Sequence, residues 1–127
     1  MHADTIIARA TFAVGDADEV TRDKLDEVLA YRKATQPLQF PSCGSVFANP
    51  PGDSAGRLIE AAGLKGYRIG AMQVAEQHAN WILNTGGGTA ADALRLIAHL
   101  QAEVKARFGV ELRPEVQRFG DFTEVDA

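Results

Sequence analysis

Several features that would assign a protein to a specialised class are scarce in this sequence. Its 127 residues include one cysteine, Cys43, so no internal disulfide can form, and no cysteine–histidine cluster has the spacing of a zinc site. Thirteen basic against 17 acidic residues leave a net charge of −4, which argues against a general attraction to nucleic acid or anionic lipid. No apolar run approaches the roughly 18 residues of a membrane span, and the N-terminal residues lack the layout of a secretory signal. We therefore expect a cytoplasmic protein with neither a nucleic-acid nor a membrane partner.

What is present fits an ordinary folded domain. Apolar residues make up 46% of the chain and charged residues 24%. The length is that of one domain and is sufficient to bury a substantial core.

The N-terminal part predicts a strand followed by a helix. Residues 5–14 are β-branched and partly alternating in polarity, which is typical of a strand. The helix has Thr21 as its N-cap and Val20 and Leu25 at the spacing of a hydrophobic staple. It ends before Pro37, because a proline disfavours the α conformation in the residue before it. One face of this helix is formed by Leu25, Val28, Leu29 and Arg32.

The middle of the chain is rich in glycine. Nine of the twelve glycines fall between residues 44 and 88, which indicates tight turns or a surface that faces a ligand. A short helix here is capped by Asp53 or Ser54 and ends at Gly63. Its apolar stripe consists of Ala55, Leu58, Ile59 and Ala62. The strands predicted in this region are Ser45–Phe47, Tyr67–Ile69, Met72–Ala75 and Trp81–Leu83.

The C-terminal part predicts one long helix with clear ends. Thr89 is its N-cap, Asp92 favours its first turn and Gly109 terminates it. Two short strands are predicted after it, at Val110–Leu112 and Val116–Phe119, and a polar tail follows over residues 121–127. The buried stripe of the helix is predicted to be Leu94, Ile97, Leu100, Val104 and Phe108.

Local pattern alone leaves the chemistry open. Ser45 follows Gly44 in a turn, where a serine usually bonds its own backbone, and Cys43 fits a small buried thiol better than a nucleophile. The loop 86–89 opens a helix, so it could hold a phosphate or simply cap that helix. His78 could contact a ligand or satisfy a turn, and Glu115 follows a proline where most glutamates are exposed.

The ordered set of segments is more specific than any single motif. In chain order these are RKATQP at 32–37, PSCGSVFANP at 41–50, AGRLIEAAGLKG at 55–66, YRIG at 67–70, HANWILN at 78–84 and GVELRPEV at 109–116. Together they resemble the C-terminal substrate-binding domain of the UDP-N-acetylenolpyruvoylglucosamine reductase family, over about residues 5–120. Members of that family are longer and hold FAD mainly in two preceding domains. The resemblance thus implies a fragment: a terminal strand of the FAD-binding region over 1–15, a substrate-binding domain over 16–120 and a tail over 121–127.

The resemblance also implies a reaction and roles for five residues. In the family, NADPH reduces FAD, and the flavin delivers hydride to the enolpyruvyl double bond of UDP-N-acetylglucosamine enolpyruvate, giving UDP-N-acetylmuramate for peptidoglycan synthesis. Ser45 matches the serine proton donor. Glu115 matches the catalytic glutamate, which we expect to act in its protonated form, kept so by the substrate carboxylate and by burial. The implied substrate contacts are Asn49, Lys65, which could equally be a surface lysine, and His78, with no metal.

Two departures qualify these expectations. Ala48 stands where the family commonly has lysine, and a family arginine beside the substrate carboxylate lies upstream of the matching segments. The expected partners are the enolpyruvyl substrate and the FAD-binding domains of the same polypeptide, and neither FAD nor NADPH is expected to bind the fragment alone.

The elements above predict an α+β fold, with a mixed sheet of short strands packed by two longer helices and one short helix. The alternatives are a non-catalytic nucleotide-sugar binding module and a structural domain that contacts a protein partner.

Overall fold

A computed structural model describes residues 8–15 and 19–120 of the chain, which divides into two units, Met1–Tyr31 and Arg32–Ala127. The first unit contains most of helix α1 (Glu19–Thr35), whose end before Pro37 confirms the prediction. The helix begins earlier than expected, so Thr21 lies inside it and is not the N-cap. Its predicted face is not buried either, because Leu25, Val28 and Leu29 are all exposed.

The predicted strand over 5–14 does not form in its described part, and residues 5–7 lie outside that part. Residues 8–15 have no regular structure, and Phe12 and Val14 are 80% and 89% exposed. A strand needs a neighbouring backbone to satisfy its N–H and C=O groups, and none is paired with these residues. The prediction was therefore wrong for residues 8–14.

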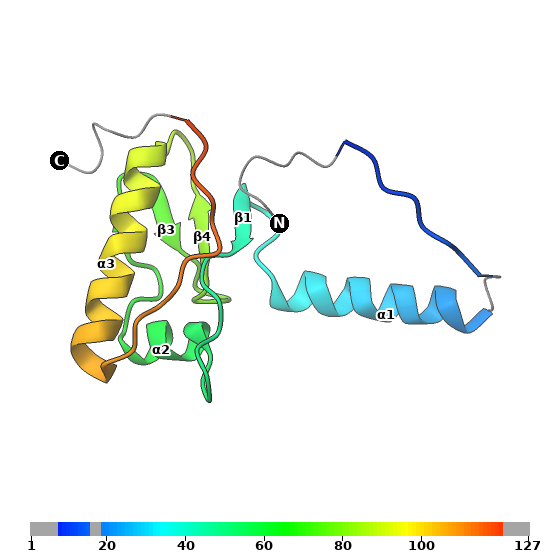
Figure 1. The fold of residues 1–127 in the computed structure, drawn as a ribbon, viewed down its shortest axis with the longest axis horizontal. Helices are drawn as coiled ribbons and strands as arrows, with labels where there is room; N and C mark the ends of the chain where they lie inside the picture. The colour runs from blue at the N-terminus through cyan, green and yellow to red at the C-terminus, as the bar shows by residue number, and fades with distance from the viewer. Residues whose placement is uncertain (1–7, 16–18, 121–127) are drawn as a thin grey trace. The chain divides into compact units, whose positions relative to one another are not determined.

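The second unit is built on a four-stranded sheet with two helices (Figure 1). The strands are β1 (Ser42–Ser45), β2 (Arg68–Ile69), β3 (Met72–Val74) and β4 (Trp81–Asn84), in the order β1-β4-β3-β2. The α+β class is confirmed. All three strand pairings are antiparallel, where a mixed sheet was expected, and the short connections from β2 to β3 and from β3 to β4 explain two of them.

Helix α3 (Ala90–Phe108) has the predicted ends. Thr89 and Asp92 form a reciprocal capping box, and Gly109 adopts the left-handed conformation at φ 69° that favours glycine at a helix end. The buried residues of this helix are Leu96, Ile97, Leu100 and Val104. The predicted stripe was therefore partly wrong, since it omitted Leu96, included the half-buried Leu94 and included the exposed Phe108.

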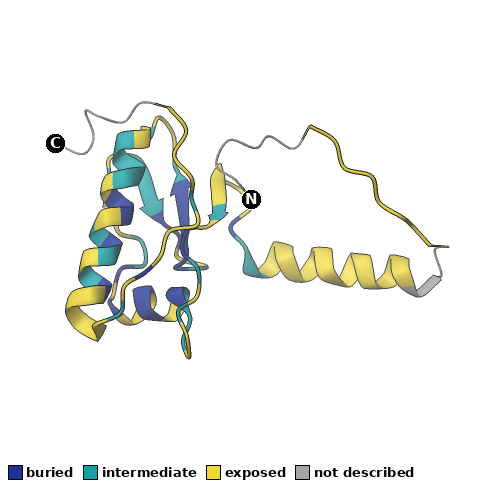
Figure 2. Ribbon diagram, in the orientation of Figure 1, coloured by how far each residue is buried: buried dark blue, intermediate teal, exposed yellow. Residues whose placement is uncertain are grey.

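Helix α2 (Ala55–Ala61) also begins as predicted, since Ser54 Oγ accepts from the Arg57 N–H at 3.3 Å. Both helices of this unit carry buried residues, drawn as dark ribbon segments in Figure 2, and α3 packs against β2, β3 and α2. The core combines residues from α2, α3, β3, β4 and the segments that connect the elements: Val46, Phe47, Ala55, Leu58, Ile59, Ala62, Leu64, Val74, Ala79, Ile82, Leu96, Ile97, Leu100, Val104 and Leu112. No helix within the described ranges is long and apolar enough to cross a membrane.

The segment after α3 is extended but contains neither of the two predicted strands. One isolated bridge joins Phe47 and Pro114, and Gln101 Nε2 donates to the Leu112 carbonyl at 2.8 Å. Pro114 has no N–H to donate, which limits ladder formation here. The segment is instead held by scattered bonds and by burial of Leu112.

Candidate functional site

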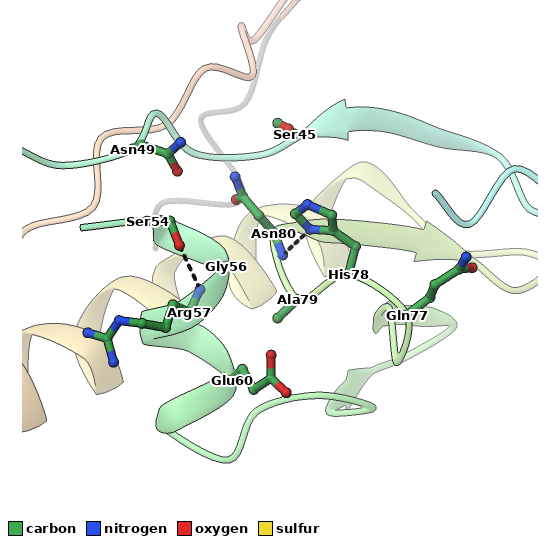
Figure 3. A pocket seen from close by; sticks show the side chains of 10 residues that line it. All are labelled: Ser45, Asn49, Ser54, Gly56, Arg57, Glu60, Gln77, His78, Ala79 and Asn80. Atoms are coloured by element: carbon green, nitrogen blue, oxygen red, sulfur yellow. Dashed lines mark hydrogen bonds between the residues drawn. The ribbon is translucent and has the colours of Figure 1, made fainter. Parts of the chain in front are cut away.

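A polar pocket of about 390 Å³ lies beside the first turns of α2 (Figure 3). It is formed where the end of β1, the loop leading into α2 and the turn before β4 meet. Its lining residues are Ser45, Asn49, Ser54, Gly56, Arg57, Glu60, Gln77, His78, Ala79 and Asn80. Of the five site residues implied by the resemblance, Ser45, Asn49 and His78 lie in this lining, and Lys65 and Glu115 do not.

Ser45 is placed at the pocket by an irregularity in β1. Gly44 has φ 80°, in the left-handed region that favours glycine. The pairing of β1 with β4 shifts register between Ser42 and Ser45. Directly after Ser45, the Val46 N–H donates to the Asn80 carbonyl at 2.9 Å. The backbone on both sides of the serine is therefore constrained, while its side chain stays exposed.

Asn80 is a buried residue of this site that the sequence did not single out. It is 4% exposed, and its side chain bonds the backbone of Phe47 twice: Oδ1 accepts from the N–H at 3.0 Å and Nδ2 donates to the carbonyl at 2.8 Å. These bonds satisfy two buried backbone groups, as a strand partner would. The signal available in the sequence was an asparagine immediately before the apolar run WIL.

Glu115 lies near Ser45 along the backbone, although the two are 70 positions apart in the chain. The Glu115 N–H donates to the Val46 carbonyl at 2.8 Å, and the Ala48 N–H donates to the Arg113 carbonyl at 3.0 Å. The segment 113–115 thus runs beside the residues that follow Ser45. The side chain of Glu115 is exposed, so the expected burial is not provided by the described residues.

His78 is held by its Nδ1, which accepts from the Asn80 N–H at 3.3 Å (Figure 3). The proton of a neutral imidazole must then lie on Nε2, which makes Nε2 the donor. The ring lies close to α2 at Gly56, where a Cβ would be in ordinary van der Waals contact with His78 Cε1 at 3.4 Å. His78 is half-buried and therefore combines a fixed orientation with access to the pocket.

Asn49 connects the pocket with the start of α2. Its Oδ1 accepts from the Ala55 N–H at 3.0 Å, which satisfies one of the amides left unbonded at a helix N-terminus. Because the oxygen is used in this bond, the donor that Asn49 can direct at a ligand is its amide nitrogen.

Two ion pairs set the charge of the pocket. Asp53 accepts from both Arg57 Nε and Nη2, and it also accepts from the Ser54 N–H at 2.7 Å. The Arg57 guanidinium, with help from the Ser54 amide, lowers the pKa of Asp53 to about 2. In the second pair, Lys65 Nζ donates to Glu60 Oε1 at 2.7 Å. Lys65 thus stands at the pocket's edge through its contact with the lining residue Glu60.

The loop 86–89 and Cys43 are the two other candidates from the sequence. In the loop 86–89, Asn84 Oδ1 accepts from the N–H groups of Gly86 and Gly88 at 3.0 Å, and Asp92 accepts from the Thr89 N–H. These amides are already bonded, so the capping interpretation fits this loop and the phosphate interpretation does not. Cys43 is exposed, which corrects the expectation of a buried thiol. In the described part of the chain, no group of three or more metal-ligating side chains comes together.

Comparison with known proteins gives a consistent result. The family model for the C-terminal domain of UDP-N-acetylenolpyruvoylglucosamine reductase matches residues 36–119. A reductase of this name from Myxococcus xanthus is 53% identical over 118 residues, which are 92% of this chain and 38% of that protein. Its counterpart from Alkalilimnicola ehrlichii is 56% identical over 107 residues, which are 84% of this chain and 36% of that protein.

A solved structure agrees with the sequence relatives. The crystal structure of the reductase from Thermus caldophilus superposes with a TM-score of 0.61 and 38% identity, covering 79% of this chain and 35% of that one. The chain therefore spans less than two-fifths of the length of these relatives. It belongs to the UDP-N-acetylenolpyruvoylglucosamine reductase family, and what it carries is the C-terminal domain of that family.

Proposed function

We propose that this chain is the substrate-binding domain of a flavoenzyme that reduces UDP-N-acetylglucosamine enolpyruvate to UDP-N-acetylmuramate, with NADPH as the reductant. The proposal is supported by family membership and by one structural observation. That observation is the pocket, which gathers Ser45 and Asn49 from one segment of the chain and His78 from another. Its hydroxyls, amides and imidazole suit the hydroxyl-rich sugar, and the Arg57 guanidinium in its lining suits a diphosphate.

Ser45 is proposed to donate the proton that completes the reduction. Hydride addition to one carbon of the enolpyruvyl double bond leaves an electron pair on the other carbon, and that carbon takes the proton from Ser45 Oγ. A hydroxyl is a weak acid, so its position relative to the carbanion matters more than its acidity. The constrained backbone on both sides of Ser45 supports this role.

Glu115 is proposed to act as a neutral acid beside the substrate carboxylate. Negative charge accumulates on that carboxylate during reduction, and a protonated glutamate would hydrogen-bond it where an ionised one would repel it. The backbone bond from Glu115 to Val46 supports a position near Ser45. Because the side chain is exposed here, the substrate or another domain would have to supply its burial.

In this family, the hydride is supplied by FAD when that cofactor is bound. The loop 86–89 does not fit a cofactor phosphate, since its Gly86, Gly88 and Thr89 amides already donate to side chains of the same chain. We accordingly assign FAD and NADPH to other parts of the reductase and give no residue of this chain a role toward them.

Calorimetry with UDP-N-acetylglucosamine tests the proposal on the chain itself. We expect saturable binding with one site, weakened at least about tenfold by His78→Ala. His99→Ala is the matched control, because His99 lies outside the pocket lining and stacks on Tyr67 with ring centroids 4.4 Å apart. Equal effects of both variants would contradict the assignment of the pocket. No saturable binding would contradict any nucleotide-sugar function and favour a structural domain.

A further inference from the structure

The two ion pairs at the pocket differ in how firmly they are held. Asp53 has three bonds: two to the Arg57 guanidinium and one to the Ser54 amide. It lies four residues before Arg57, and it is not part of the pocket lining. A planar guanidinium that meets a carboxylate with two N–H groups is a geometrically specific contact. This pair is therefore a fixed part of the start of α2.

The pair between Glu60 and Lys65 has fewer bonds. A single bond at 2.7 Å joins the two side chains, which are 59% and 29% exposed, about as exposed as Arg57 and Asp53 at 57% and 27%. Such exposed pairs contribute little to stability, so exchanging the partner of the lysine has a small cost. Glu60 lines the pocket and Lys65 does not, so the bond to the Glu60 carboxylate is what connects the lysine with the pocket.

The charged side chains at this pocket are paired with one another before an anion enters. Arg57 and Glu60 are its two charged lining residues, and they are opposite in sign. The Arg57 charge is already matched by Asp53, so the pocket offers no unmatched positive charge while Glu60 occupies Lys65. A diphosphate gains the charge of Lys65 only when the Glu60 carboxylate leaves it.

We propose that Glu60 is an internal counter-ion that the diphosphate of the ligand replaces on Lys65, so that Glu60 sets the affinity of the pocket. The inference rests on the proposed function, because it takes the ligand to be a nucleoside diphosphate sugar. Glu60 holds Lys65 at the pocket in the free protein and competes with the ligand for it. The same competition disfavours uncharged ligands, because they cannot release Lys65 from Glu60.

The test is a double-mutant cycle measured by calorimetry with UDP-N-acetylglucosamine. The variants are Glu60→Gln, Lys65→Gln and the two combined. Glu111→Gln is the matched control, because it removes a carboxylate from another exposed lysine pair, with Lys105, outside this pocket. Glu60→Ala serves as a second variant, and thermal unfolding verifies that each protein is folded.

We expect Glu60→Gln and Glu60→Ala to tighten binding about three- to tenfold, and Lys65→Gln to weaken it. In the Lys65→Gln background, Glu60→Gln should have no further effect on the Kd, because the lysine for which Glu60 and the diphosphate compete is gone. The inference is wrong if Glu60→Gln changes the Kd no more than Glu111→Gln, if it weakens binding, or if its gain persists without Lys65. If the unsubstituted chain does not bind at all, the proposed function itself fails, and the inference fails with it.

Discussion

At the scale of single residues, the site depends on one buried amide. Asn80 has no charge and no proposed contact with the reacting atoms, yet it bonds both backbone groups of Phe47 and, through its own backbone, Val46 and His78. The positions of Ser45 and His78 at one pocket therefore both depend on the segment around Asn80.

We predict that Asn80→Ala destabilises the fold strongly. The substitution leaves a buried N–H and a buried carbonyl of Phe47 without partners, at about 1–3 kcal/mol for each unsatisfied group. The measurement is the free energy of unfolding in urea. Gln77→Ala, which removes an exposed amide from the same pocket, should cost much less. Similar losses in the two variants would mean that the Asn80 bonds contribute little.

A second prediction at this scale concerns Asp53 and the stability of the fold at acidic pH. Its pKa is lowered from 3.8 to about 2 in the folded chain, so the carboxylate stabilises the fold above about pH 4, and this contribution is lost as the pH falls toward 2. Asp53→Asn should therefore flatten the fall of the melting temperature between pH 4 and 2. An unchanged slope in the variant would show that other carboxylates dominate the acid transition.

At the scale of secondary structure, the sequence predicted the features that depend on neighbouring residues. Ser54, Thr89 and Gly109 are at helix ends as expected, because capping involves residues within one turn. The strand predicted at Ser45–Phe47 lies earlier, at Ser42–Ser45, since its pairing partner β4 is far along the chain. The strand over 8–14 and those after α3 failed for the same reason: alternation alone cannot supply a partner.

The capping box of α3 leads to a prediction at this scale. Thr89→Ala removes the hydroxyl that accepts from the Asp92 N–H at 3.1 Å, and we expect a loss of about 1 kcal/mol in the free energy of unfolding. Thr89→Ser keeps the hydroxyl and should stay close to the unsubstituted chain. If both variants unfold at the same urea concentration as the original, the cap does not limit the stability of α3.

At the scale of the whole molecule, the family resemblance suggests roles for residues whose chemistry the local patterns leave open. Ser45, Asn49 and His78 each had an ordinary structural explanation by themselves, and the pocket brings them together. The positions of Lys65 and Glu115 relative to the pocket could not be predicted from the sequence. Lys65 reaches the pocket only through Glu60, and Glu115 approaches Ser45 only through a long-range backbone bond.

The proposed catalytic role of Ser45 has to be measured in a complete reductase that carries this domain. We predict that Ser45→Ala slows reduction of the enolpyruvyl substrate about 10²–10⁴-fold, the usual contribution of general acid catalysis, and leaves reduction of the flavin by NADPH unchanged. Stopped-flow absorbance follows the two half-reactions separately. Equal slowing of both would indicate a structural role for Ser45 instead.

The central claim, that this domain binds a UDP-linked sugar in the pocket beside α2, is tested most directly by nuclear magnetic resonance. The chain is labelled with ¹⁵N, and its backbone amide signals are followed during titration with UDP-N-acetylglucosamine. We predict that the largest shifts occur at Ser45, Asn49, Gly56 and His78, and saturate together with one Kd. Saturating shifts confined to the loop 86–89, or no saturating shifts at all, would contradict the account.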